Sequence, residues 1–201
     1  MDKFIIHGSQ EPLNGRVSIS GSKNSSLPIL AATLLTRETC VIRRVPDVSD
    51  TNYLLAILRS LGADVERASG TVTVSAEKLQ SVAPYDLVRK MRASVCVMGP
   101  LLARLHQATV SLPGGCVIGD RPIDLHLRGF EALGAAIRVE AGDVHVKADE
   151  LVGTEINLRG TAGPTVLGTD NVMMAAVLAK GTTIIDGAAA EPEVVDLASF
   201  L

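Results

Sequence analysis

An internal repeat with a spacing of 72 residues (61 to 133) constrains the fold more than any other feature of this sequence. The segment Leu61-Gly62-Ala63 recurs as Leu133-Gly134-Ala135. The residues that follow keep the same spacing, in the pairs Val65 and Ile137, Gly70 and Gly142, Val72 and Val144, and Val74 and Val146. Such self-similarity indicates a chain built from a repeated supersecondary unit.

Each copy of the repeat predicts a helix followed by a β-hairpin. Before each Leu-Gly-Ala segment, apolar residues recur at helical spacing, namely Leu54, Leu55, Leu58 and Leu61 in the first copy and Ile123, Leu127 and Phe130 in the second. Gly62 and Gly134 then stand where glycine commonly ends a helix. Alternating apolar and polar residues follow on both sides of Ser69-Gly70 and Ala141-Gly142, as in hairpin strands.

A second helix and a strand precede each unit. The helices are predicted over 26–35, 88–104 and 171–179, and they are apolar on all sides, which is typical of buried helices. Strands are predicted over 40–42, 109–111 and 183–185. Each strand leads to a proline and then an acid that opens the next helix, in the pairs Pro46 and Asp50, Pro122 and Asp124, and Pro192 and Asp196. The predicted fold class is therefore α/β, with three copies of a helix-strand-helix-hairpin unit.

The third copy, which begins near Thr169, is predicted to be incomplete. The Leu of Leu-Gly-Ala follows the helix-opening Asp by 11 residues in the first copy (50 to 61) and by 9 in the second (124 to 133). From Asp196, the same repeat would place this Leu at about 205–207. The sequence ends at Leu201. We therefore expect a third unit that is cut short.

Composition excludes two classes of function. The 201 residues are 47% apolar, enough for a packed core, but only 2% are aromatic, which argues against a platform that stacks nucleic-acid bases. The net charge is 19 − 22 = −3, which argues against binding to nucleic acid or to an anionic membrane surface. A few local cations must therefore hold any anionic ligand.

Cysteine usage and the start of the chain favour a cytoplasmic protein. Cys40, Cys96 and Cys116 are odd in number and widely spaced, so neither a disulfide framework nor a zinc site is expected. No apolar stretch reaches the roughly 18 residues of a membrane span. The segment 1–8 turns polar too early for a signal peptide.

The segment from Ser20 to Pro28 has the composition of a helix start beside an anion site. Small polar residues precede a proline at an early helical position. The free N–H groups of such a helix end can bind an anion together with the Lys23 ammonium. The spacing does not match a P-loop, and the alternative is an ordinary helix N-terminus with a solvated lysine.

Two arginines open the helix predicted over 88–104. Arg89 and Arg92 are three residues apart and would share a helical face. A solvated helix edge is the common explanation of such a pair. Arg92 is the better functional candidate, because the sequence turns apolar directly after it.

The strongest chemical signal is the loop over 112–124. Three glycines and two prolines surround Cys116, and Arg121 follows five residues later. A thiol has an ordinary pKa of about 8.5, so an exposed Cys116 near a cation could act as a general acid or, once ionised, as a nucleophile. Cys40 and Cys96 lie in apolar segments, where small buried side chains are expected.

Three of these segments resemble UDP-N-acetylglucosamine 1-carboxyvinyltransferases, a family of enolpyruvyl transferases. The matching motifs are Ser20-Gly21-Ser22-Lys23-Asn24, Met91-Arg92-Ala93-Ser94 and, most specifically, Pro113-Gly114-Gly115-Cys116 through Arg121-Pro122-Ile123-Asp124-Leu125. The resemblance runs over the whole chain. It implies an inside-out α/β barrel of two similar domains with three repeats each, in agreement with the repeats found above.

The resemblance also implies an activity. It implies transfer of the enolpyruvyl group of phosphoenolpyruvate to the 3′-hydroxyl of UDP-N-acetylglucosamine with release of phosphate, a step of peptidoglycan and cell-wall synthesis that uses no metal or organic cofactor. Lys23, Asn24 and Arg121 would bind phosphoenolpyruvate. Cys116 would be the proton donor and the target of the epoxide fosfomycin. The nucleotide sugar would be bound by Arg92, Arg121, Pro122, Ile123, Asp124, Leu125, Thr165 and Val166.

The chain departs from the family in two ways. Thr165-Val166-Leu167-Gly168-Thr169 replaces a Ser-Val-Gly-Ala-Thr-like turn, so the glycine is displaced. Family members are also about twice as long, and their second half supplies the other wall of the cleft. We therefore expect residues 22–201 to be an incomplete substrate-binding domain and residues 1–21 to be a strand segment that packs with an absent second domain.

Two alternative functions stay open. A shikimate-pathway enolpyruvyl transferase would share the fold, although the cysteine loop argues against it. A non-catalytic half-protein that binds a sugar nucleotide would keep the segment from Arg121 to Leu125 and would tolerate Cys116→Ala. In each case the expected partners are small molecules, without nucleic acid or membrane.

Overall fold

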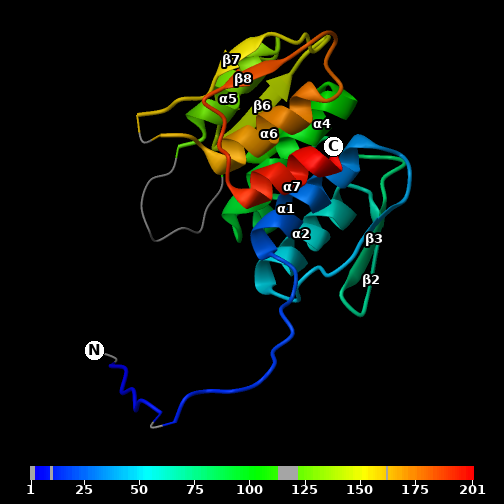
Figure 1. The fold of residues 1–201 in the computed structure, drawn as a ribbon. Helices are drawn as coiled ribbons and strands as arrows, with labels where there is room; N and C mark the ends of the chain where they lie inside the picture. Colours follow the sequence, from blue (N-terminus) through cyan, green and yellow to red (C-terminus); the bar gives the residue numbers. More distant parts are fainter. Residues whose placement is uncertain (1–2, 10, 113–121, 162) are drawn as a thin grey trace.

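The structure is a computed structural model that describes residues 3–9, 11–112, 122–161 and 163–201. Helices and short strands alternate along the chain (Figure 1). In chain order, the elements are α1 (Lys23–Ala32), η1 (Thr33–Leu35), β1 (Cys40–Ile42), α2 (Ser49–Ser60), β2 (Asp64–Ala68), β3 (Thr71–Ser75), α3 (Tyr85–Val88), η2 (Arg92–Val97), α4 (Met98–Leu105), β4 (Gln107–Ser111), α5 (Asp124–Ala132), β5 (Ala136–Glu140), β6 (Asp143–Lys147), β7 (Glu155–Asn157), α6 (Val166–Ala176), β8 (Ile184–Asp186) and α7 (Pro192–Phe200).

The predicted repeat is confirmed in the first two units. Each contains a three-stranded antiparallel sheet with the same topology, β1-β3-β2 in the first unit and β4-β6-β5 in the second. The register is also repeated, since Val65 pairs with Val74 and Ile137 pairs with Val146. The third unit differs, because β8 pairs in parallel with β7, a strand that the sequence pattern did not predict.

Glycine ends the helix of each repeat, as predicted. Gly62 and Gly134 follow the last residues of α2 and α5 with φ angles of +98° and +102°. The Cβ of any other residue disfavours this left-handed conformation. Ser69 and Gly70 both have positive φ, as the two-residue turn of a tight hairpin requires. The local chemistry of these turns therefore fixes the α2–β2–β3 and α5–β5–β6 units.

The helices form the interior of the fold and the sheets lie outside them. In Figure 1, α1, α4, α6 and α7 occupy the middle of the molecule, with β2 and β3 on one side and β6, β7 and β8 on the other. The core is aliphatic, as expected, and its largest fully buried side chains are mostly leucines. Leu30 of α1, Leu101 of α4 and Val172 of α6 are fully buried. Burial of these helices on several faces explains why their sequences are apolar all round.

The helix predicted over 88–104 is wrong as a continuous element. The chain breaks at Met91, which is extended (φ −148°, ψ 132°), and continues as the 3₁₀ helix η2 and then as α4. Pro100 explains part of this break: it has no N–H to donate to the Cys96 carbonyl, so it fits only in the first turn of a new α-helix. Arg89 ends α3 whereas Arg92 opens η2, so the two arginines do not share one α-helical face.

The other predicted helices begin later than the observed ones. α1 starts at Lys23 and α6 at Val166, ahead of the predicted starts at 26 and 171. The first turn of α1 is polar, from Lys23 to Ser26, whereas α6 begins with Val166, Leu167 and Gly168 directly after its cap residue Thr165. The apolar pattern alone therefore misses the first turn of each helix.

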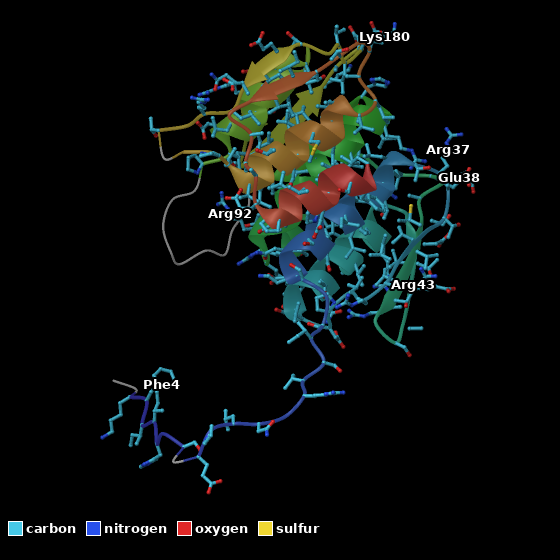
Figure 2. All side chains as sticks on the ribbon, in the orientation of Figure 1. Phe4, Arg37, Glu38, Arg43, Arg92 and Lys180 are labelled. Carbon is cyan, nitrogen blue, oxygen red and sulfur yellow. The ribbon has the colours of Figure 1, made fainter. Side chains whose placement is uncertain are left out.

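The described residues before α1 extend away from the helices (Figure 1). Residues 3–9 and 11–20 contain no assigned helix or strand, and their side chains are exposed, including that of Phe4, which is 97% exposed and labelled in Figure 2. Whether this segment pairs as a strand with a further domain stays a prediction.

Candidate functional site

The N-terminus of α1 carries two predicted site residues, and each is held by an acid from another helix. Ser22 caps the helix, since its hydroxyl accepts a hydrogen bond from the Ser25 N–H. The Lys23 ammonium donates to Oδ2 of Asp50 in α2 at 2.8 Å. The Asn24 amide donates to Oε1 of Glu193 in α7 at 3.2 Å. One ammonium proton of Lys23 and one amide proton of Asn24 are therefore already donated to internal carboxylates.

A cavity of about 400 Å³ opens beside these residues, and we call it the Lys23 cavity. Its walls come from α1, α2, η2, α6 and α7. The charged and polar side chains that line it are Lys23, Asn24, Asp50, Lys90, Arg92, Asp170 and Glu193. Positive and negative side chains are thus mixed around this cavity.

A second cavity of about 490 Å³, the Thr165 cavity, lies beside the first. Arg92, Val166 and Leu167 line both cavities. Arg92 is half-buried, and Figure 2 shows it near the beginning of α7. The Thr165 cavity also contains predicted nucleotide-binding residues, namely Pro122, Asp124, Leu125 and Thr165. The arginine is therefore placed to contact two ligands at once, one in each cavity.

The N-terminus of α6 forms the boundary between the cavities. Thr165 caps this helix by accepting a hydrogen bond from the Gly168 N–H at 3.2 Å, and the Thr165 carbonyl accepts the Thr169 hydroxyl at 2.7 Å. A Cβ on Gly168 would lie 2.3 Å from the Thr165 methyl carbon, so glycine is required at this displaced position. The first N–H groups of α6 favour an anion.

The predicted site residues fall into three groups. Lys23, Asn24, Arg92, Pro122, Asp124, Leu125, Thr165 and Val166 line the two cavities. Ile123 is 7% exposed, belongs to the hydrophobic core and does not line either cavity. Cys116 and Arg121 lie outside the described residues. Cys96 is buried and Cys40 is half-buried, as expected of small filler residues, and burial raises the pKa of both thiols.

Sequence reasoning missed Asp170, which lines the Lys23 cavity. Asp170 is 1% exposed, and within the described part of the chain neither of its carboxyl oxygens has a hydrogen-bond partner. Burial, together with the negative charges of Glu193 and Glu191, raises the pKa of Asp170 to about 7. The available signal was an acid inside the apolar segment 166–176, a position where ionised side chains are rare unless paired.

Behind Asp170, Asn171 joins α6 to its neighbours. Its Oδ1 accepts a hydrogen bond from the Gly99 N–H at 2.7 Å, and its Nδ2 donates to the Val95 carbonyl at 2.8 Å. Nδ2 also lies 3.0 Å from Nδ1 of His126, which must then accept the bond. Burial lowers the pKa of His126 to about 4, with a further contribution from the Arg92 charge, so this imidazole is neutral at pH 7. The network is structural and sets the position of the α6 N-terminal half.

Within residues 3–9, 11–112, 122–161 and 163–201, no cluster of three or more His, Cys, Asp or Glu side chains is arranged to hold a metal ion. Among the same residues, no helix combines the length and the apolar character needed to cross a membrane.

The fold is that of an enolpyruvyl transferase. The enolpyruvyl transferase NikO from Streptomyces tendae superimposes with a TM-score of 0.81 at 25% identity, over 95% of this chain and 45% of that one. EPSP synthase from Acinetobacter baumannii has the same fold, with a TM-score of 0.70 at 16% identity over 90% of this chain and 42% of that one. The predicted fold class is thus confirmed.

The chain belongs to the EPSP synthase (3-phosphoshikimate 1-carboxyvinyltransferase) family, whose model matches residues 8–201. It is similar to the UDP-N-acetylglucosamine 1-carboxyvinyltransferases of Methylacidiphilum infernorum, at 65% identity, and of Akkermansia muciniphila, at 61%. The matches cover 100% of this chain but 48% and 47% of those proteins. The resemblance is confirmed, and the chain spans about half the length of the curated relatives it matches.

Proposed function

We propose that this chain is the substrate-binding, N-terminal half of an enzyme that transfers the enolpyruvyl group of phosphoenolpyruvate to the 3′-hydroxyl of UDP-N-acetylglucosamine. In this proposal the complete protein acts in the cytoplasm, in the first committed step of peptidoglycan precursor synthesis. The observation that carries the proposal is the pair of adjoining cavities that share Arg92. Similarity to proteins of that name, at 54–65% identity, supports this acceptor.

In this proposal each cavity binds one of the two substrates. Phosphoenolpyruvate would occupy the Lys23 cavity, where Lys23 and Asn24 would exchange their present carboxylate partners for its phosphate and carboxylate. The nucleotide sugar would occupy the Thr165 cavity, whose lining includes Arg92, Pro122, Asp124, Leu125, Thr165 and Val166. Arg92 at the boundary would hold the sugar so that its 3′-hydroxyl faces the enolpyruvyl carbon. This arrangement supplies proximity, which is a large part of catalysis between two substrates.

The reaction proposed for these groups is an addition followed by an elimination. The 3′-oxygen attacks C2 of phosphoenolpyruvate and loses its proton, while a proton is added at C3, for which Cys116 is the proposed donor. Loss of a proton from C3 and departure of inorganic phosphate from C2 then restore the double bond as an enol ether. No electrons leave the two substrates. Lys23 and Arg121 are proposed to neutralise the phosphate as it departs.

Residues 22–201 are proposed to be the substrate-binding domain, and residues 1–21 a segment that packs with a second domain. Such a second domain would supply the opposite wall of the cleft. Alone, the 201-residue chain should bind substrates weakly and turn them over negligibly, because groups that neutralise charge in the transition state would be missing. A normal rate of phosphate release by the isolated chain would contradict this assignment.

Calorimetric titration of the chain with UDP-N-acetylglucosamine tests the proposal. We expect Arg92→Ala to weaken binding by about 10- to 100-fold, the loss typical of one hydrogen bond to a charged group. Arg89→Ala is the matched control, because Arg89 carries the same charge three residues away and lies over the Tyr85 ring at 5.5 Å. Equal losses in the two variants would contradict a specific role for Arg92.

Two further ligands separate the alternative functions. Preference for shikimate 3-phosphate over the nucleotide sugar would replace the proposed acceptor with that of the shikimate-pathway enzymes. Fosfomycin treatment followed by intact-mass measurement tests Cys116: we expect one adduct on the wild-type chain and none on Cys116→Ala. Binding of the nucleotide sugar without an adduct would favour a non-catalytic half-protein.

A further inference from the structure

Asp170 is a buried acid that the proposed mechanism does not use. Asp170 is the fifth residue of α6 and lines the Lys23 cavity, although it is only 1% exposed. Neither of its oxygens has a hydrogen-bond partner within the described residues. Leaving a buried carboxyl group without a partner costs free energy. Because Asp170 belongs to the wall of the Lys23 cavity, a ligand bound there is the candidate for the missing partner.

The groups around Asp170 include both signs of charge. α1 contributes Lys23 and η2 contributes Arg92, and both line the same cavity. The acids are Asp50 of α2, and Glu193 and Glu191 at the start of α7. Lys90 is a further cation that lines the cavity. Cys96 of η2 and His126 of α5 are neutral at pH 7, because burial raises the pKa of the thiol and lowers that of the imidazole to about 4. The charged residue of α4, Arg104, lies at its C-terminal end and donates to carbonyls there.

An anionic substrate in this cavity would lie against Asp170. If Asp170 were ionised, an unpartnered carboxylate would face the phosphate or carboxylate of the ligand in a partly desolvated site, where like charges repel strongly. If it were protonated, the same side chain could donate a hydrogen bond to the ligand. We propose that Asp170 takes up a proton when an anionic substrate occupies the Lys23 cavity and then donates a hydrogen bond to that substrate. This inference rests on the proposed binding of phosphoenolpyruvate.

The acidity of Asp170 is consistent with such an exchange. Asp170 has a pKa of about 7, so it is partly ionised at neutral pH before the ligand arrives. The negative charge of the ligand would raise this pKa further, and a proton would enter from solvent. Asp170 would thus act as a positioning residue whose protonation state follows the occupancy of the site. Asparagine, which is always neutral, could donate the hydrogen bond but could not take up the proton.

Titration calorimetry of the full 201-residue chain with phosphoenolpyruvate tests the proposal directly. Measured at pH 7.5 in two buffers with different ionisation enthalpies, the heats give the number of protons taken up per ligand. We expect roughly 0.7 proton for the wild-type chain, the ionised fraction of a group with a pKa of about 7. Asp170→Asn should show an uptake near zero. Asp86→Asn, which removes an exposed acid of α3, should behave as the wild type.

The pH dependence of affinity provides a second measurement. From pH 6.5 to pH 8.5, wild-type affinity should fall by roughly 20-fold relative to Asp170→Asn, because only the protonated wild type binds. Ionisation of the ligand phosphate affects both proteins equally and cancels in this ratio. Wild-type binding without proton uptake, or equal uptake by Asp170→Asn, would overturn the role of Asp170 and leave the proposed function standing. Failure of every variant to bind phosphoenolpyruvate would overturn both, and the wild-type measurement needs no variant to fold.

Discussion

Replacement of Asn171 by alanine should destabilise the chain by removing the side chain that joins α6 to three other helical segments. The carbonyl oxygen of Asn171 accepts from the Gly99 N–H at 2.7 Å, and its amide group donates to the Val95 carbonyl at 2.8 Å and to His126 Nδ1 at 3.0 Å. All of these partners are buried. Gly99 lies in the first turn of α4, where backbone N–H groups have no partner within the helix.

The expected loss follows from the partners that alanine would leave behind. The Gly99 N–H and His126 Nδ1 would become unpaired inside the protein, at about 1–3 kcal/mol each. The Val95 carbonyl would lose less, because it also accepts from the Met98 N–H. We therefore expect the free energy of unfolding to fall by about 4 kcal/mol. At about 2–4 °C per kcal/mol for a chain of this size, the melting temperature would fall by roughly 8–16 °C.

Urea unfolding at pH 7.5 measures this loss, and Asn52→Ala is the matched control. The Asn52 side chain also makes two hydrogen bonds, to Asp47 at 2.9 Å and from Arg67 at 2.7 Å, but it is exposed at the surface of α2. Water can replace both bonds, so the control should lose less than about 1 kcal/mol. Equal losses in the two variants would refute the reasoning that burial makes the Asn171 bonds costly to remove.

Three other outcomes are expected. Asp170 has a folded-state pKa of about 7, above the ordinary value of 3.8, so its contribution to stability is present below pH 4 and is lost as the pH rises to 7. In urea unfolding, Asp170→Asn should therefore be up to about 4 kcal/mol more stable than the wild type at pH 8. At pH 4 the variant should show no gain in stability. Gly129→Ala would place a Cβ 2.2 Å from Val172 Cγ2 and should cost about 1–3 kcal/mol in thermal unfolding, with part of the loss recovered by adding Val172→Ala. Asp50→Asn should free Lys23 and tighten phosphoenolpyruvate binding about 2- to 5-fold in calorimetry, the modest gain typical of an exposed ion pair.

The parts of the fold that were predictable from sequence are those determined by residues that are adjacent in the chain. The end of α2 at Gly62 and the turn at Ser69-Gly70 follow from backbone conformations that few residues adopt, so their sequence signals are strong. The break at Met91 was missed because the apolar pattern of a buried α-helix also fits a 3₁₀ segment. Pro100 was a visible signal of that break, since a proline is expected in the first turn of a helix.

Sequence patterns predicted the basic residues of the candidate site but not the acids that pair with its donors. Lys23 and Arg92 could be selected because each stands at the start of a helical segment, where the sequence changes from polar to apolar. The acids that hold these regions could not be selected in the same way: Asp50 is 27 residues from Lys23, and Glu193 is 169 residues from Asn24. The Asn24–Glu193 pair forms where helices of two different repeats pack together, and the Lys23–Asp50 pair forms where two helices of the same repeat pack together. No local pattern encodes either contact.

These acids change how an anion would bind to a chain with a net charge of −3. The sequence predicts local cations that are solvated until a ligand binds. In the structure, however, Lys23 pairs with Asp50, and Asn24 pairs with Glu193. Phosphoenolpyruvate would then bind beside these internal carboxylates or compete with them, so its binding free energy is reduced by their like charge. Specificity must come from what the internal carboxylates cannot do, which is to contact Lys23, Asn24 and a protonated Asp170 together. A singly charged anion that reaches Lys23 alone should therefore compete poorly with Asp50.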